Sequence, residues 1–405
     1  MKIRTITTFL DPGWPLDGKL LDRAGQFRHA AQEAFTQAGY EVQTTRLTTI
    51  PFPQILPESQ LLDALAFAQT LENAATARGY GYICLGPATP DNLQSYQLLP
   101  NIFAATQNTS ASGVIADKTH GISLPAIRAA AEVIHRCVAH DPNGFGNFFF
   151  TASANVPPGG PFFPSGYHGG GPPAFALGTE AADLAVAAFS SAHTLAEARQ
   201  NLIEAVETHA QKLSQIAETL TAAYAIRYTG IDFTLAPFPD EVLSIGTALE
   251  RLGVPALGLH GSTAAAAFLV DTLERARFPR AGFNGLMLPV LEDATLAARA
   301  ADGNLTVTDL LLLSTVCGTG LDTVPLPGDT TPEQLTAILL DVAALSLRLD
   351  KPLTARLVPI PGKSAGDWIE FDFPYFANSR VMGVRAQGLG RLFAGDEHFE
   401  LRQRS

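Results

Sequence analysis

Apolar and polar residues alternate at the start of the chain in a way that predicts a half-buried strand. Residues 2–9 read KIRTITTF, and residues 41–48 are a second segment rich in Val and Thr. Between them, residues 17–38 carry apolar positions at helical spacing and are followed by Gly39, a common helix terminator. The three segments together predict a β-α-β unit.

The same alternation continues along the chain. We expect further helices at 60–78, 123–139, 180–190, 194–223, 241–252, 262–276, 293–301, 306–316 and 332–349, and further strands at 80–86, 113–116, 145–156, 231–236, 284–291 and 353–360. Strands that alternate with helices pair in parallel through crossover helices, which indicates the α/β class. The pattern does not separate a closed barrel from an open doubly wound sheet. The strand-like C-terminal segments WIEFDFPYF and HFELRQR predict a small β-rich cap.

Two stretches rich in glycine and proline interrupt this rhythm. They are PPGGPFFPSGYHGGGPPAFALG, residues 157–178, and STVCGTGLDTVPLPGDTT, residues 314–331. Because proline removes a backbone donor, we expect both to be loops rather than regular structure. Residues 1–405 are expected to form one domain, and 157–179 is the candidate position for an internal subdivision.

Composition narrows the class of protein. Hydrophobic residues make up 46% of the chain, charged residues 16%, and the net charge is -12. This describes a globular protein, and the deficit of Lys and Arg argues against nucleic-acid binding. We find neither a signal peptide nor an uninterrupted apolar span, and the three cysteines lack CxxC spacing. We therefore expect a cytoplasmic protein without membrane segments, disulfides or a cysteine-based zinc site. We expect it to bind a small molecule, and the chain is also a candidate for forming a homo-oligomer.

Polar residues that stand out follow predicted strands or lie in the Gly/Pro stretches. In parallel α/β folds, ligand sites form at the carboxyl ends of the strands. We therefore expect 231–241, 286–293, 317–329 and 356–367 to converge at one end of the sheet. Three candidates for catalysis are Cys317, Asp322 and His168. Candidates for substrate binding are Asn155, Asp232, His260, Arg356, Lys363 and Asp367.

Acidic residues in these segments outnumber nearby cations. Carboxylate oxygens that converge would bind Mg²⁺, Mn²⁺ or Ca²⁺, and Glu292 and Asp293 are the candidate ligands. Each candidate also has a structural interpretation. Cys317 fits a small buried residue at a helix end, Asp322 and Asp232 fit turn residues, and Asp329 fits an N-cap before the helix at 332–349. The glycines around His168 and His260 allow a ligand to approach closely, although a lone histidine is commonly structural.

Several long segments carry a family resemblance. They include SANVPPGGPFFPSGYH, GIDFTLAPFP, GLMLPVLED, VCGTGLDTVPLPGD and ARLVPIPGKSAGD. With the opening MKIRTIT, they resemble the UPF0210 family, also called DUF711, over nearly the whole chain. The resemblance implies a single α/β barrel of about ten strands with outer helices, like that of pyruvate formate-lyase and ribonucleotide reductase. It implies no established activity.

Three hypotheses about function follow. The first is an enzyme that acts on a small, polar, anionic metabolite in a barrel cavity, with a divalent cation as one candidate cofactor. The second is a non-catalytic metabolite sensor or scaffold that uses the same cavity. The third is a glycyl-radical-type enzyme, suggested by Cys317 and the segment SRVMGVRA around Gly383. A histidine, Cys317 and acids within reach of one another would favour catalysis, and a polar pocket without nucleophile or base would favour sensing.

Overall fold

The computed structural model describes residues 1–403, and its first half confirms the predicted alternation of strands and helices. No helix among these residues is both long enough and apolar enough to span a bilayer. The first half contains β1 (Lys2–Phe9), α1 (Gly18–Gln37), β2 (Val42–Thr48), α2 (Phe52–Ile55), α3 (Ala64–Thr76), β3 (Tyr82–Cys84), α4 (Leu93–Ala105), β4 (Thr109–Asp117), β5 (Gly121–Ser123), α5 (Leu124–Cys137), β6 (Phe150–Ala154), β7 (Ala174–Glu180) and α6 (Ala182–Ser191).

The second half continues to the C-terminal segment. It contains α7 (Leu195–Tyr224), β8 (Arg227–Ala236), α8 (Ile245–Arg251), α9 (Ser262–Arg275), the short 3-10 turn η5 (Val290–Glu292), α10 (Ala294–Ala301), α11 (Val307–Leu313), β9 (Gly320–Pro327), α12 (Pro332–Arg348), β10 (Leu353–Ile360), β11 (Trp368–Ile369), β12 (Ser379–Arg380) and β13 (His398–Phe399). The strand predicted at 284–291 was wrong, because this segment is irregular and ends in η5.

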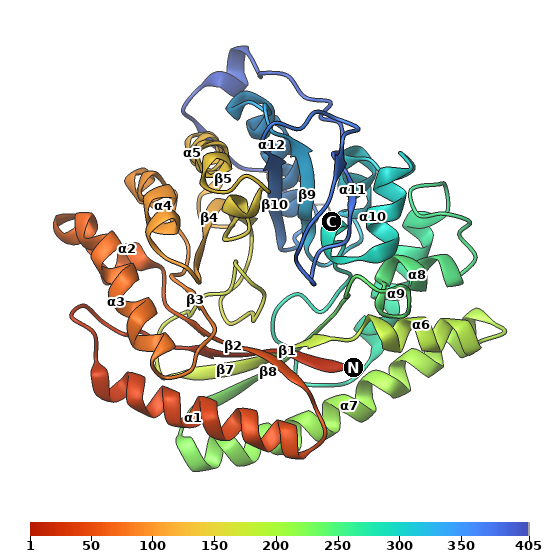
Figure 1. The fold of residues 1–405 in the computed structure, drawn as a ribbon, viewed down its shortest axis with the longest axis horizontal. Helices are drawn as coiled ribbons and strands as arrows, with labels where there is room; N and C mark the ends of the chain where they lie inside the picture. The colour runs from red at the N-terminus through yellow and green to blue at the C-terminus, as the bar shows by residue number, and fades with distance from the viewer. Residues whose placement is uncertain (404–405) are drawn as a thin grey trace.

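The main sheet contains three groups of parallel strands that are joined by two antiparallel pairs. It is an 11-stranded sheet with the principal order β8-β7-β1-β2-β3-β4-β6-β10-β9, extended by β5 and β13. The pairs β1–β7 and β6–β10 are antiparallel, whereas the other neighbours along the principal order are parallel. Figure 1 shows the sheet curving with the helices on its outer side.

The sheet does not close into a barrel, which differs from the predicted closed architecture. Within residues 1–403, no ladder joins the end strands β8 and β9. The irregular segment between them makes one isolated bridge to each side, Ile231 with Arg280 and Pro289 with Asp322. The predicted β-rich cap is smaller than expected. It contains the paired strands β11 and β12, of two residues each, whereas β13 pairs with β5 of the main sheet.

Two segments expected to be loops contain strands. The Gly/Pro stretch 157–178 ends in β7, which is buried throughout, and 314–331 contains β9. Pro325 and Pro327 lie within β9 and pair in register with Val358 and Ile360 of β10. Proline is tolerated in a strand at the end of a sheet, where a missing donor breaks no ladder on the outer side. The prolines of this segment therefore do not prevent it from forming a strand.

Local capping fixes where several helices begin. Asp17 accepts hydrogen bonds from the amides of Lys19 and Leu20 at 2.9 and 3.1 Å and so starts α1. The N-cap of α12 is Thr331, which forms a capping box with Gln334. The expectation that Asp329 is this cap was wrong, because its exposed side chain lies two residues before the cap.

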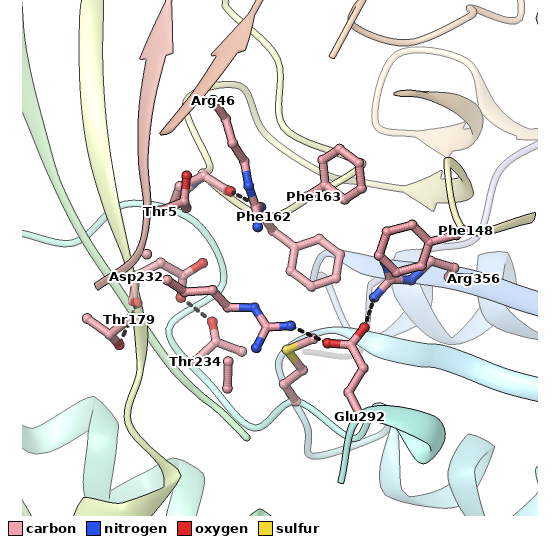
Figure 2. A pocket seen from close by; sticks show the side chains of 15 residues that line it. Thr5, Arg46, Phe148, Phe162, Phe163, Thr179, Asp232, Thr234, Glu292 and Arg356 are labelled. Carbon is pink, nitrogen blue, oxygen red and sulfur yellow. Dashed lines mark hydrogen bonds and ion pairs between the residues drawn. The ribbon is translucent and has the colours of Figure 1, made fainter. Parts of the chain in front are cut away.

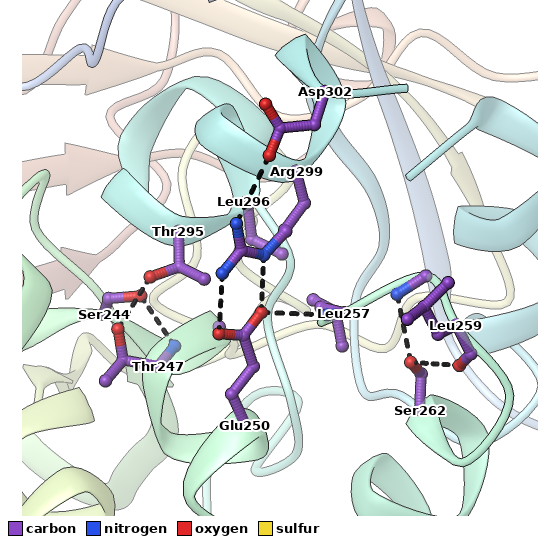
Figure 3. A network of polar contacts seen from close by, with 12 residues as sticks. Ser244, Thr247, Glu250, Leu257, Leu259, Ser262, Thr295, Leu296, Arg299 and Asp302 are labelled. Carbon is purple, nitrogen blue, oxygen red and sulfur yellow. Dashed lines mark hydrogen bonds and ion pairs between the residues drawn. The ribbon is translucent and has the colours of Figure 1, made fainter. Parts of the chain in front are cut away.

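A polar network joins α8 to α10 on the outer layer (Figure 3). Arg299 of α10 donates to both carboxylate oxygens of Glu250 in α8, at 2.7 and 2.9 Å. Glu250 also accepts the amide of Leu257 at 2.9 Å, which ties the following loop to the same pair. The fork geometry of this ion pair aligns the two helices.

Candidate functional site

One cavity lies on the inner side of the curved sheet. It encloses about 500 Å³ of space between protein atoms, counted up to its open mouth. Its walls come from β1, β2, β7, β8 and β10 and from the aromatic segment at 148–163. A neighbouring cavity of about 480 Å³ shares Arg4, Arg46, Phe148, Phe163 and Glu292 with it. We call the two together the central cavity; Figure 2 shows the part of it described first.

A buried ion-pair network forms one wall of the central cavity. The guanidinium of Arg356 donates from Nε to Asp322 at 2.6 Å and from an Nη atom to Glu292 at 2.7 Å. All three side chains are at most 3% exposed. Arg4 of β1 donates to the second oxygen of Glu292, so this carboxylate bridges two arginines from opposite parts of the sheet. The bridge links β1 with β10 across the cavity.

The local fold holds Glu292 and Asp322 in position. Pro289 pairs with Asp322 through an isolated bridge, and the hydroxyl of Thr323 accepts the amide of Leu291 at 3.3 Å. The turn η5, which ends at Glu292, is therefore attached to the beginning of β9. These contacts bring the two carboxylates to the same guanidinium.

The ion pairs shift the protonation of this network. Burial raises the pKa of Asp322 to about 6, Arg356 opposes the shift, and nearby Glu292 adds to it. Burial disfavours the charge of Arg356, but Asp322 and Glu292 more than compensate, and its pKa is raised. One oxygen of Asp322, Oδ2, is buried without a hydrogen-bond partner among residues 1–403. Asp322 thus faces Arg356 and is not among the residues that line the cavity.

Arg46 of β2 differs from the other two arginines of the central cavity. Its guanidinium donates to the hydroxyl of Thr44 at 3.2 Å and to the carbonyl of Pro161 at 3.5 Å, and it lies 5.0 Å from the ring centroid of Phe163. It forms no ion pair with any carboxylate among the described residues. Burial lowers its pKa to about 9, and the positive charge of Arg4 contributes. The side chain is therefore still charged at neutral pH, with donors left free.

Aromatic side chains form much of the cavity wall, and Phe148 lies over the guanidinium of Arg356 at 5.1 Å from its ring centroid. Phe148, Phe162 and Phe163 line the cavity, and Figure 2 shows Phe162 and Phe163 beside Arg46. Tyr82 and Tyr375 extend the aromatic surface into the adjoining part. Such a wall offers apolar contact and stacking to an organic ligand.

Asp232 of β8 lines the cavity, but its carboxylate is bound to the irregular segment at 283–284. Its oxygens accept the amides of Phe283 and Asn284, each at 3.0 Å, and the hydroxyl of Thr234. Burial raises its pKa, and these hydrogen bonds oppose the shift. The carboxylate is used to fix the irregular segment that follows the bridge at Arg280.

The structure brings some of the sequence candidates together. Arg356, Asp322 and Glu292 are in direct contact, and Asp232 lines the same cavity. Asp293, the neighbour of Glu292, instead caps α10 and accepts five hydrogen bonds, from the hydroxyl of Ser244 and the amides of Ile245, Gly246, Thr295 and Leu296. Within residues 1–403, we find no group of three His, Cys, Asp or Glu side chains placed to hold a metal ion.

Other candidates lie away from the central cavity. Asn155 donates to Asp350 at 3.3 Å, and His260 is exposed in the loop before α9. His168 is buried and lines a separate cavity. Lys363 donates to the carbonyl of Trp368.

The remaining two candidates have local contacts. Asp367 accepts the amide of Ser364 at 2.7 Å in an exposed turn. Cys317 is 2% exposed, its sulfur accepts the amide of Gly320 at 3.2 Å, and it is not among the residues of either part of the central cavity. Gly383 lies in an irregular segment after β12.

Sequence reasoning missed the two arginines on β1 and β2. Arg4 and Arg46 lie inside β1 and β2, among mostly apolar residues and threonines, in a chain with 27 basic residues against 39 acidic ones. An arginine inside a strand that is expected to be buried is a signal for a polar cavity. The predicted site residues include two inside later strands, Asp232 and Arg356, but neither Arg4 nor Arg46.

Comparison with known proteins places this geometry among uncharacterised relatives. The family model described as "Uncharacterised ACR (DUF711)" matches residues 1–378. A "UPF0210 protein" of Pyrobaculum arsenaticum is 29% identical, covering 91% of this chain and 84% of the relative. A "UPF0210 protein" of Pelotomaculum thermopropionicum is 30% identical, covering 87% and 82%. One of Neisseria meningitidis is 30% identical, covering 82% and 77%.

Proposed function

This chain belongs to the DUF711 family of uncharacterised proteins, and we propose that it binds a small organic acid in the central cavity. The observation that carries the proposal is the state of Arg46. It is a charged side chain in a largely apolar cavity, and it has no carboxylate partner among residues 1–403. Burying a charge without a partner is costly, so such an arginine is best explained by an anion that arrives with the ligand.

The other two arginines of the cavity support this assignment by contrast. Arg4 and Arg356 both form an ion pair with Glu292, and Arg356 forms a second one with Asp322. An incoming anion would have to displace these buried carboxylates from them. At Arg46 the contacts to replace are a hydroxyl and a carbonyl at 3.2 and 3.5 Å. A carboxylate can instead accept two parallel hydrogen bonds from a guanidinium.

The aromatic wall indicates an organic body rather than an inorganic ion. Phe148, Phe162 and Phe163 line the cavity together with Met287, and these side chains offer no hydrogen bonds to a hydrated ion. The hydroxyls of Thr5, Thr179 and Thr234 supply polar contacts on another side. A carboxylate attached to an apolar or aromatic group would satisfy both surfaces.

Binding is better supported than turnover. The cavity contains neither a cysteine nor a histidine among the residues that line it. Of its carboxylates, Glu292 bridges two arginines and Asp232 accepts hydrogen bonds from the amides of Phe283 and Asn284. A pocket with a free cation but without a free nucleophile or base favours a sensor or carrier of the ligand.

A screen by thermal unfolding tests the proposal. Aliphatic and aromatic monocarboxylates are added singly to the protein, and ligands that bind only the folded state raise its melting temperature. We expect aromatic acids to stabilise the native chain and the control Arg251→Gln, which loses an exposed arginine of α8. Arg46→Gln should not respond. The proposal is wrong if no acid stabilises the native protein, or if Arg46→Gln responds like the control.

A further inference from the structure

A second cavity lies beside the glycine-rich segment that contains His168. It contains about 970 Å³ of space between protein atoms, counted up to its open mouth. It shares no lining residue with the central cavity. It is formed where β1 ends at Phe9 and where β7 and β8 begin at Ala174 and Arg227. It therefore combines the carboxyl end of one strand with the amino ends of two others.

The charge of this second cavity is opposite to that of the whole protein. Its ionisable lining residues are Arg227, Arg280 and His168, and no Asp or Glu is among the residues that line it. The chain as a whole has a net charge of -12. A concave surface with only basic groups raises the local concentration of anions.

The two arginines are held differently, and both have donors available. Arg280 donates through one nitrogen to the carbonyls of Leu273 and Ala276, each at 2.7 Å, and lies 4.3 Å from the ring centroid of Phe278. These contacts fix its guanidinium at the end of α9. Arg227 is exposed at the start of β8 and has neither a side-chain hydrogen bond nor an ion pair within the described part of the chain.

His168 adds a fixed ring to the same wall. It is 4% exposed, its backbone amide donates to the carbonyl of Thr49 at 2.8 Å, and its Nε2 lies 3.2 Å from the carbonyl of Gly171. Since a carbonyl can only accept, Nε2 carries the proton and Nδ1 is left for another partner. Nδ1 makes no hydrogen bond to residues 1–403.

The backbone supplies further donors. The exposed glycines 169 and 170 follow His168 and line the cavity, and the structure records no hydrogen bond from their amides. Gly170 has a φ of +90°, a conformation that glycine adopts without strain. Free amides in a glycine-rich turn are typical components of anion sites.

We propose that the second cavity binds a phosphate group, either free phosphate or the phosphate of a small metabolite. Two guanidinium groups and the amides after His168 offer more donors than a carboxylate can accept. The oxygens of a phosphate match this number. The site is separate from the organic-acid site around Arg46, and its proposal does not depend on that one.

Titration calorimetry with inorganic phosphate tests the inference on the full chain. The variant Arg227→Gln removes an exposed arginine without protein contacts and should fold normally, which circular dichroism verifies. Arg251→Gln is the control for the loss of one surface charge, and Arg46→Gln is the control for the central cavity. We expect phosphate affinity to fall about tenfold in Arg227→Gln, as for one lost charge-assisted hydrogen bond, and to stay unchanged in both controls.

Glycerol phosphate serves as a second ligand that separates the two sources of the phosphate. Tighter binding than inorganic phosphate would assign the site to a phosphorylated metabolite, and equal affinity would assign it to phosphate alone. The inference is overturned if inorganic phosphate does not bind the native protein, or if Arg227→Gln and Arg251→Gln weaken it equally. A loss in Arg46→Gln alone would also overturn it, because the phosphate would then occupy the central cavity.

Discussion

Arg356 lies 2.7 Å from Glu292, and both side chains are only 3% exposed, so this ion pair is buried inside the curved sheet. Glu292 also binds Arg4, and Arg356 also binds Asp322. The network neutralises two of the cavity's arginines with acids from the chain itself. It leaves Arg46 as the cation available to a ligand, which is the basis of the proposed function.

We predict that breaking this network destabilises the fold. Asp322→Ala removes one of the two carboxylate partners of a buried guanidinium, and because Glu292 stays in place the cost should be at most about 3–5 kcal/mol. The free energy of unfolding, measured by urea denaturation, should fall accordingly. The double variant Asp322→Leu/Arg356→Met removes both charges and should recover much of the loss. If the double variant is no more stable than Asp322→Ala, the cost does not come from the unpaired charge.

A second prediction concerns the start of α12. Thr331→Ala removes the side-chain cap and should lower the free energy of unfolding by about 1 kcal/mol. Asp329→Ala changes an exposed residue two positions earlier and should have an effect near zero. Urea denaturation of the two variants in parallel measures the difference. A larger loss in Asp329→Ala would restore the cap that the sequence first indicated.

Asp293 provides a third prediction, on metal. Its oxygens accept five hydrogen bonds, so Asp293→Ala should destabilise the protein by at least about 2 kcal/mol, through the lost cap and the buried amides left without partners. The loss should be the same before and after treatment with a chelator. A melting temperature that falls on chelation of the native protein and recovers with Mg²⁺, Mn²⁺ or Ca²⁺ would instead support a metal role.

His120 leads to a prediction about pH. Its ring nitrogens lie 2.8 Å from Asp117 and 3.0 Å from Asp91, and the hydrogen bond to Asp117 raises its pKa above the usual 6.5, although burial opposes the shift. The folded state therefore holds this proton more tightly than the unfolded state. The resulting stabilisation is fully present below pH 6.5 and is lost as the pH rises through the folded value.

The comparison is between the native protein and His120→Asn. The native protein should lose a few tenths of a kcal/mol more than the variant on going from slightly acidic to slightly alkaline pH, because a partly exposed pair is screened by solvent. Urea denaturation at several pH values gives both profiles. Parallel profiles would show that His120 contributes nothing to the pH dependence.

The sequence predicted the α/β class because long helices such as α1, α7 and α12 have apolar residues at helical spacing, which indicates the buried face of each helix. It also singled out Asp322, Glu292 and Arg356, for catalysis, metal binding and substrate binding, and the structure brings these three side chains into contact in one ion-pair network. What it did not predict depends on contacts between distant segments. The gap between β8 and β9, for example, is set by the irregular segment that holds Asn284 and Pro289.

The roles of the candidate residues were harder to predict than their positions. Glu292 and Asp293 are adjacent, yet one joins two arginines across the sheet and the other caps α10. Successive residues point in different directions, so neighbours in the sequence need not share a site. His168 lies in the loop before β7 and Arg46 lies in β2 of the same sheet, yet the two residues line different cavities.

The central claim is tested most directly by the affinity of Arg46 variants for the organic acid that stabilises the native protein most. Titration calorimetry should give an affinity at least about tenfold lower for Arg46→Gln than for Arg251→Gln, as expected for one lost charge-assisted contact. The free energy of unfolding of this variant should be close to that of the native protein, because the charge that is lost is only partly buried and has no carboxylate partner. Equal affinities in the two variants would contradict the assignment of Arg46 as the anion-binding residue.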